Sequence, residues 1–190
     1  MHYPAEDFRF QPIREQDLPM LHEWLLRPHV AQWWGPAESV DELRQDYVDG
    51  RKAPNATRAY IASFAGQPIG FIQAYVVKDS GGGWWEDETD PGARGIDQFL
   101  ADGDRLGQGL GRAMIRAFLD HLFADPAVTV VQTDPAPTNA RAIRCYLRAG
   151  FRPVGPVTTP DGAALLMRCA RPGSLPFAGT PAAPSTPAQR

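Results

Sequence analysis

Two stretches decide the fold of this chain: Leu106-Gly107-Gln108-Gly109-Leu110-Gly111 and Asn139-Ala140-Arg141-Ala142-Ile143-Arg144-Cys145-Tyr146-Leu147-Arg148-Ala149-Gly150-Phe151. The first joins a predicted strand, 95–101, to a predicted helix whose apolar residues recur every four positions from Leu110 to Leu122. Glycines let the backbone of such a turn approach a ligand closely, and the amides at the start of a helix lack partners. The turn therefore predicts an anion-binding site.

This glycine turn differs from two common phosphate loops. No Lys-Ser or Lys-Thr pair follows it, as a Walker A loop requires, and its spacing does not fit the dinucleotide-binding fingerprint. The alternative to an anion-binding site is a tight strand-to-helix turn that binds no ligand. The second stretch predicts a helix over 139–149, with Gly150 where a helix C-cap belongs.

Outward from these stretches, the chain alternates predicted strands and helices. Asp17 is a predicted N-cap for a helix that Pro28 stops, and Ser39-Val40-Asp41-Glu42 fits a capping box. The remaining helices are the two described above. Strands are predicted at 8–14, 58–64, 68–77, 95–101, 127–133, 151–157 and 163–169. This order predicts an α/β domain with a mixed central sheet flanked by helices.

Length and composition bound the class of protein. The chain has 190 residues, which predicts one domain over 8–171, with an N-terminal extension at 1–7 and a disordered, proline-rich tail at 172–190. A net charge of −3 argues against a nucleic-acid partner. Two cysteines exclude a disulfide scaffold and a four-cysteine zinc site, and the four histidines show no metal-ligand spacing. No apolar run approaches membrane-spanning length and no signal peptide is recognisable, so we expect a cytoplasmic protein without a metal.

A second constellation combines tryptophans with acids. Trp84-Trp85 lies in a glycine-rich loop, and Trp33-Trp34 repeats the pair in a predicted loop after the first helix. Between Asp79 and Asp104 there are eight acidic residues and one basic residue, Arg94. Carboxylates supply charge-assisted hydrogen bonds and aromatic faces supply stacking or cation–π contacts, so this region predicts a polycationic ligand with apolar ring surfaces.

The two stretches that open this section together resemble the acyl-CoA-binding core of the GNAT N-acetyltransferases. The resemblance implies the GNAT acyltransferase fold, with acetyl-CoA as co-substrate. It also implies that the glycine turn binds the pyrophosphate, that Asn139 lies near the pantetheine arm and that Tyr146 protonates the departing thiolate. Arg105 or Arg112 would replace the Arg or Gln that the family often has at Leu106. The implied cofactor-binding residues are Gln98, Phe99, Leu100, Arg105, Gly107, Gln108, Gly109, Leu110, Gly111, Arg112 and Asn139.

A narrower resemblance covers about Phe8 to Met167. The blocks Trp33-Trp34-Gly35, Gly83-Trp84-Trp85-Glu86, Arg94-Gly95-Ile96-Asp97-Gln98 and Gln132-Thr133-Asp134-Pro135 are similar to those of the aminoglycoside 6′-N-acetyltransferases. This implies acetyl transfer to the 6′-amine of aminoglycosides, hence antibiotic resistance, by a monomer or homodimer. Gly82 stands where the relatives are expected to have an aspartate. The implied substrate-binding residues are Trp33, Trp34, Trp84, Trp85, Asp97, Asp134 and Asp161.

The acceptor amine must lose a proton, and Asp97 is the candidate base. A model Asp titrates near ~3.9, so the role requires burial or neighbouring acids to raise its pKa. Alternatively, Asp97 only orients the ammonium group or forms a strand-end salt bridge with Arg94. Asp134 binds amines or caps a turn. Two other functions stay open: an acetyltransferase for a polyamine or siderophore hydroxylamine, and a non-catalytic binder of cationic ligands.

Overall fold

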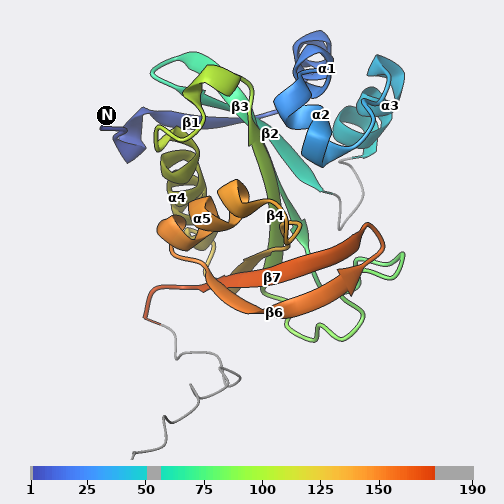
Figure 1. The fold of residues 1–190 in the computed structure, drawn as a ribbon, viewed down its shortest axis with the longest axis vertical. Coiled ribbons are helices and arrows are strands. Elements are labelled where there is room, and N and C mark those ends of the chain that lie inside the picture. Colours follow the sequence, from blue (N-terminus) through green and yellow to red (C-terminus); the bar gives the residue numbers. More distant parts are fainter. Residues whose placement is uncertain (1, 51–56, 174–190) are drawn as a thin grey trace, which may run out of the picture.

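A seven-stranded mixed sheet forms the centre of the structure, a computed structural model that describes residues 2–50 and 57–173 (Figure 1). The strand order is β1-β2-β3-β4-β5-β7-β6; β4 and β5 run parallel, whereas every other neighbouring pair is antiparallel. The seven strands confirm the predicted fold class. They are β1 (Phe8–Pro12), β2 (Arg58–Phe64), β3 (Gln67–Val76), β4 (Ala93–Leu100), β5 (Val130–Thr133), β6 (Arg152–Thr159) and β7 (Gly162–Ala170).

Helices cover both faces of the sheet (Figure 1). Since side chains alternate along a strand, Phe71 of β3 packs into the core beneath the first three helices, while the next residue, Ile72, packs into the core that contains α4. The helix α5 lies against α4 and β6. The α-helices are α1 (Leu18–Leu25), α2 (Pro28–Trp34), α3 (Val40–Arg44), α4 (Leu110–Phe123) and α5 (Ala140–Ala149).

In the first helical region, the structure confirms that a helix stops before Pro28 and corrects the loop predicted after it. The helix α1 ends at Leu25, but Pro28 then begins α2, because proline is tolerated in the first turn of a helix. The tryptophan pair Trp33-Trp34 therefore closes a helix and does not lie in a loop. Asp17 precedes α1 as expected, but its carboxylate accepts a hydrogen bond from the Arg14 backbone amide and makes no cap contact with α1.

The parallel strands β4 and β5 separate soon after they meet. Their pairing runs from Ala93↔Val130 to Gly95↔Gln132 only, whereas β4 continues to Leu100. At the two ends of the β3–β4 ladder, Val77 donates to the Ala93 carbonyl and Ala101 donates to the Ile69 carbonyl. Because antiparallel bonding alternates along a strand, the even-numbered amides, including those of Gln98 and Leu100, point into the gap that β5 leaves.

The ends of the chain bear on the predicted domain limits. Tyr3, in the predicted extension 1–7, meets the Phe64 ring edge-on with centroids 5.3 Å apart. The predicted tail 172–190 lies outside the described residues from 174 onward. Within the described part of the chain, no helix is long and apolar enough to cross a membrane.

Candidate active site

An acidic cavity of about 600 Å³ opens at the gap between β4 and β5. It is lined by β3, β4, the end of β5, the turn between β6 and β7, and α2. Its carboxylates are Asp97, Asp134 and Asp161, and no lysine or arginine lines it among the described residues. Trp33, Trp34 and Trp84 add aromatic surface. The cavity thus offers negative charge beside ring faces.

Asp97 is held in place by its cross-strand neighbour. Gln73 pairs with Asp97 between β3 and β4, and its Nε2 donates to Asp97 Oδ2 at 2.9 Å. Burial raises the pKa of Asp97; the bond from Gln73 opposes this, and the charge of Asp161 adds to it. The guanidinium of Arg94 donates instead to the Pro91 and Ala93 carbonyls, so the structure does not form the Asp97–Arg94 salt bridge.

Asp134 follows the last residue of β5, at the mouth of the same gap. Burial raises the pKa of Asp134 to about 7, and the charges of Asp97 and Asp161 contribute. A carboxyl that titrates near neutral pH can accept a proton from an ammonium group and release it again, as general acid–base catalysis requires. The structure therefore supplies the elevated pKa that a base role for these aspartates needs.

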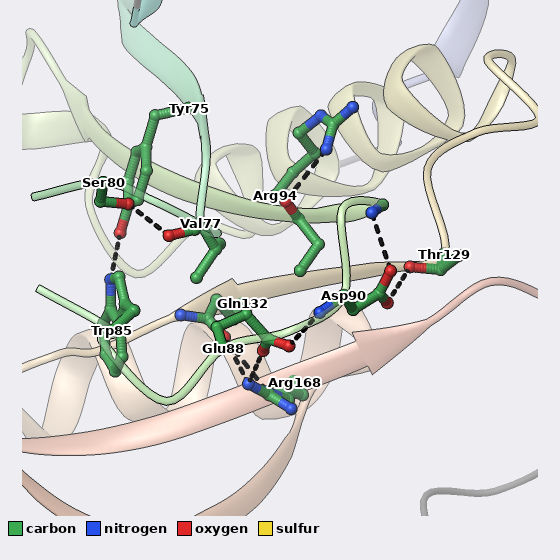
Figure 2. A network of polar contacts seen from close by, with 12 residues as sticks. Tyr75, Val77, Ser80, Trp85, Glu88, Asp90, Arg94, Thr129, Gln132 and Arg168 are labelled. Carbon is green, nitrogen blue, oxygen red and sulfur yellow. Dashed lines mark hydrogen bonds and ion pairs between the residues drawn. The ribbon is translucent and has the colours of Figure 1, made fainter. Parts of the chain in front are cut away.

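The loop between β3 and β4 is fixed by polar contacts at several points along its length (Figure 2). In the middle of the loop, Trp85 Nε1 donates to the Tyr75 hydroxyl at 3.2 Å, while the Tyr75 ring lies where a side chain on Gly95 would have to be. Three residues further along, Arg168 of β7 donates to Glu88 Oε2 at 2.5 Å and to the side-chain oxygen Oε1 of Gln132 at 2.9 Å. These contacts hold the loop that carries Trp84.

This network corrects the interpretation of the acidic run from Asp79 to Asp104. Of the eight acids, Asp97 alone lines the acidic cavity, whereas Glu88 pairs with Arg168. Asp90 accepts from the Gly92 amide and the Thr129 hydroxyl, and Asp102 caps a short 3₁₀ turn. The acidity of the cavity comes from three separate elements and not from the local run.

A basic cavity of about 550 Å³ adjoins the acidic one. The glycine turn lies on its wall: Gly107 and Gly109 have φ values of +73° and +89°, and Gly109 precedes α4 without any side-chain cap. The first amides of α4 therefore lack intrahelical partners and are free for an anion. Four arginines also line this cavity, and among the described residues no acid does; they are Arg112, Arg141, Arg144 and Arg148.

The two cavities form one continuous cleft, because Trp33, Trp34, Gln98, Asn139 and Ala142 line both of them. At this junction, Asn139 caps α5 by accepting the Ala142 amide at 3.0 Å.

Tyr146 follows two turns further along α5 and lines the acidic half. Burial raises the pKa of its hydroxyl above the ordinary value, against the opposing effects of Thr133 and Gln98. The hydroxyl thus keeps its proton at neutral pH and is available as a donor.

Three predicted site residues line neither cavity. Leu110 is fully buried in the core, Arg105 lies in the short turn before the glycines, and Trp85 packs beside Val77, Ala93 and Val130. The remaining predicted residues line the cleft. Sequence reasoning missed Tyr47, Gln73, Tyr75, His29 and the arginines of α5. The strand alternation that places Gln73 and Tyr75 on one face was available as a signal; their register against Asp97 was not.

No group of three or more metal-ligating side chains occurs in the described portion of the chain. The cleft instead pairs a phosphate-type turn with a cavity that can accept a cation, at a gap in which strand amides are free. Residues 14–159 match the acetyltransferase (GNAT) domain family. The fold and the site therefore define a GNAT acetyltransferase domain.

Two groups of relatives narrow this class. An aminoglycoside N(6′)-acetyltransferase type 1 from Klebsiella pneumoniae is 52% identical over 158 residues, which cover 82% of this chain and 79% of the relative. A structure of AAC(6′)-Ib with coenzyme A and kanamycin is 49% identical, with a TM-score of 0.81 over 86% of this chain and 95% of the other. A structure of AAC(6′)-Ib with ribostamycin and coenzyme A is 48% identical, with a TM-score of 0.82 over 87% of this chain and 94% of the other. The chain belongs to the aminoglycoside N(6′)-acetyltransferase family.

Proposed function

We propose that this protein transfers the acetyl group of acetyl-CoA to the 6′-amine of aminoglycoside antibiotics and so confers resistance to them. The division of charge along one cleft carries the proposal. Among the described residues, the acidic cavity is lined by three aspartates and no lysine or arginine, and the basic cavity by four arginines and no Asp or Glu. The two cavities meet where β4 and β5 separate. A polycationic amine and a polyanionic acetyl donor fit these halves and would meet at the junction.

The residues at the junction have separable roles in the proposed reaction. Acetyl-CoA supplies an activated acyl group. The strand amides of Gln98 and Leu100 point into the gap, where they would polarise the thioester carbonyl. Asp97 takes the proton of the attacking amine, and Asp134 binds neighbouring ammonium groups. Tyr146 donates its phenolic proton to the leaving thiolate.

The remaining contacts position the acceptor. Trp33, Trp34 and Trp84 supply ring faces along the sugar, and Asp161 supplies charge. Gln73 Oε1 is buried without a hydrogen-bond partner within the described residues, so it offers an acceptor to a hydroxyl or ammonium of the drug.

The catalytic domain is proposed to span 8–171 and to act in the cytoplasm.

A matched pair of drugs tests the reaction and its position. Neomycin carries a 6′-amine and paromomycin a 6′-hydroxyl in the same framework. We expect thiol release from acetyl-CoA with neomycin and kanamycin, and background release with paromomycin and with spermidine. Mass spectrometry of the product should show one added acetyl group. Equal turnover of neomycin and paromomycin would refute the 6′ position, and turnover of spermidine alone would favour a polyamine acetyltransferase.

A further inference from the structure

The basic cavity holds more positive charge than a pyrophosphate site needs. Arg112 lies in the first turn of α4, beside the glycine turn, while Arg141, Arg144 and Arg148 belong to α5. On a helix, residues three, four and seven apart lie on one face. The α5 arginines therefore form a stripe along the cavity wall, separate from the amides that the glycine turn offers.

These arginines lack internal counter-charges. Within 2–50 and 57–173, none of the four forms an ion pair, and the cavity wall contains no carboxylate. The segments outside the described residues contain no Asp or Glu in their sequence. Like charges three or four residues apart on a helix destabilise it, so this stripe has a cost that a bound anion would offset.

Cys145 shows that arginines of the two helices converge. A Cβ on Gly111 would lie 3.7 Å from Cys145 Sγ, so the first turn of α4 passes close to α5 here. Burial raises the pKa of Cys145 to about 11, and Arg112 and Arg148 both oppose this rise. Both guanidinium groups therefore act on the same point of α5, where their combined field would attract a multivalent anion.

We propose that Arg144 and Arg148, continued by Arg141, bind the ribose 3′-phosphate of coenzyme A. The inference rests on the proposed function, which supplies coenzyme A as the ligand. Two of its phosphates form the pyrophosphate, which the glycine turn and Arg112 accommodate. The third is a separate group carrying close to two negative charges, and guanidinium groups bind phosphate oxygens bidentately. The site selects the phosphorylated cofactor at a distance from the reacting atoms.

Acetyl-3′-dephospho-CoA is the probe, because it lacks only this phosphate. We expect wild-type protein to show a KM for acetyl-CoA about tenfold lower than for the dephospho compound, with similar kcat, since charge-assisted hydrogen bonds contribute at this level. The variant R144Q/R148Q should raise the KM for acetyl-CoA about tenfold and leave the KM for the dephospho compound nearly unchanged. The preference for acetyl-CoA would then be lost.

The control is R116Q, which removes an exposed arginine of α4 that does not line the cavity. It should retain the wild-type preference. Equal KM values for the two donors in wild-type protein would overturn the proposal, as would a double variant that raises both equally. Calorimetry with CoA and 3′-dephospho-CoA, without an acceptor, repeats the comparison as dissociation constants. It thereby separates failure of this subsite from failure of aminoglycoside acetylation.

Discussion

At the scale of a single residue, Asp134 of the acidic cavity makes stability depend on pH. Its pKa of about 7 in the folded protein exceeds the ordinary value of 3.8, chiefly because of burial. Between these two values the folded state holds a proton that the unfolded state has released. Stability therefore falls as the pH rises from about 4 to 7, and the ionised carboxylate at pH 8 costs free energy.

The variant D134N should for this reason be more stable than wild type at pH 8, but not at pH 4. We expect a gain of about 1–2 kcal/mol at pH 8, reduced from the full linkage value because Asp134 keeps some contact with solvent. The same variant should raise the KM for aminoglycosides. Urea unfolding at both pH values measures the first effect and thiol release the second. A variant equally stable at both pH values, relative to wild type, would contradict the assigned burial cost.

At the scale of an element, the loop between β3 and β4 depends on the Glu88–Arg168 pair. Both side chains are largely shielded, with 11% and 23% exposure. E88Q keeps the shape of the side chain but removes the negative charge from this shielded pair, which should lower stability by about 1–3 kcal/mol. A looser loop presents Trp84 less well, so the KM for the acceptor should rise several-fold while the KM for acetyl-CoA stays constant.

The exposed Asp87, on the same loop, provides the matched control. D87N removes the same charge without breaking a contact, so it should change neither stability nor the acceptor KM by a comparable amount. If E88Q and D87N behaved alike, the net charge of the loop and not its anchoring would explain the result.

Elements with strong local signals could be predicted from the sequence. Ser39 and Glu42 form the capping box, and Asn139 and Gly150 bound α5 as expected, because these contacts lie within a few residues of each other. The helix α2 was missed because Pro28 ends one helix and begins another, and both roles are compatible with its fixed φ.

Site residues that belong to one local motif could be predicted from the sequence. Those that depend on contacts between distant strands could not. The glycine turn could be placed from its local spacing, whereas Tyr146 was singled out only by the resemblance to the GNAT N-acetyltransferases. The acids from Asp79 to Asp104 could not be sorted, because the Glu88–Arg168 pair joins residues 80 positions apart. Gln73 was likewise invisible until the β3–β4 register placed it opposite Asp97.

At the scale of the whole molecule, the two halves of the cleft should respond to salt independently. The KM values for aminoglycoside and acetyl-CoA should both rise about threefold or more between about 0.02 and 0.5 M KCl, because screening acts on the exposed charges. D161N should flatten only the acceptor response and R144Q only the acetyl-CoA response, so each variant controls for the other. Steady-state kinetics with kanamycin measures both slopes. If either variant flattened both slopes, the charges would act as one diffuse field, and the separation into an acidic and a basic half would not govern binding.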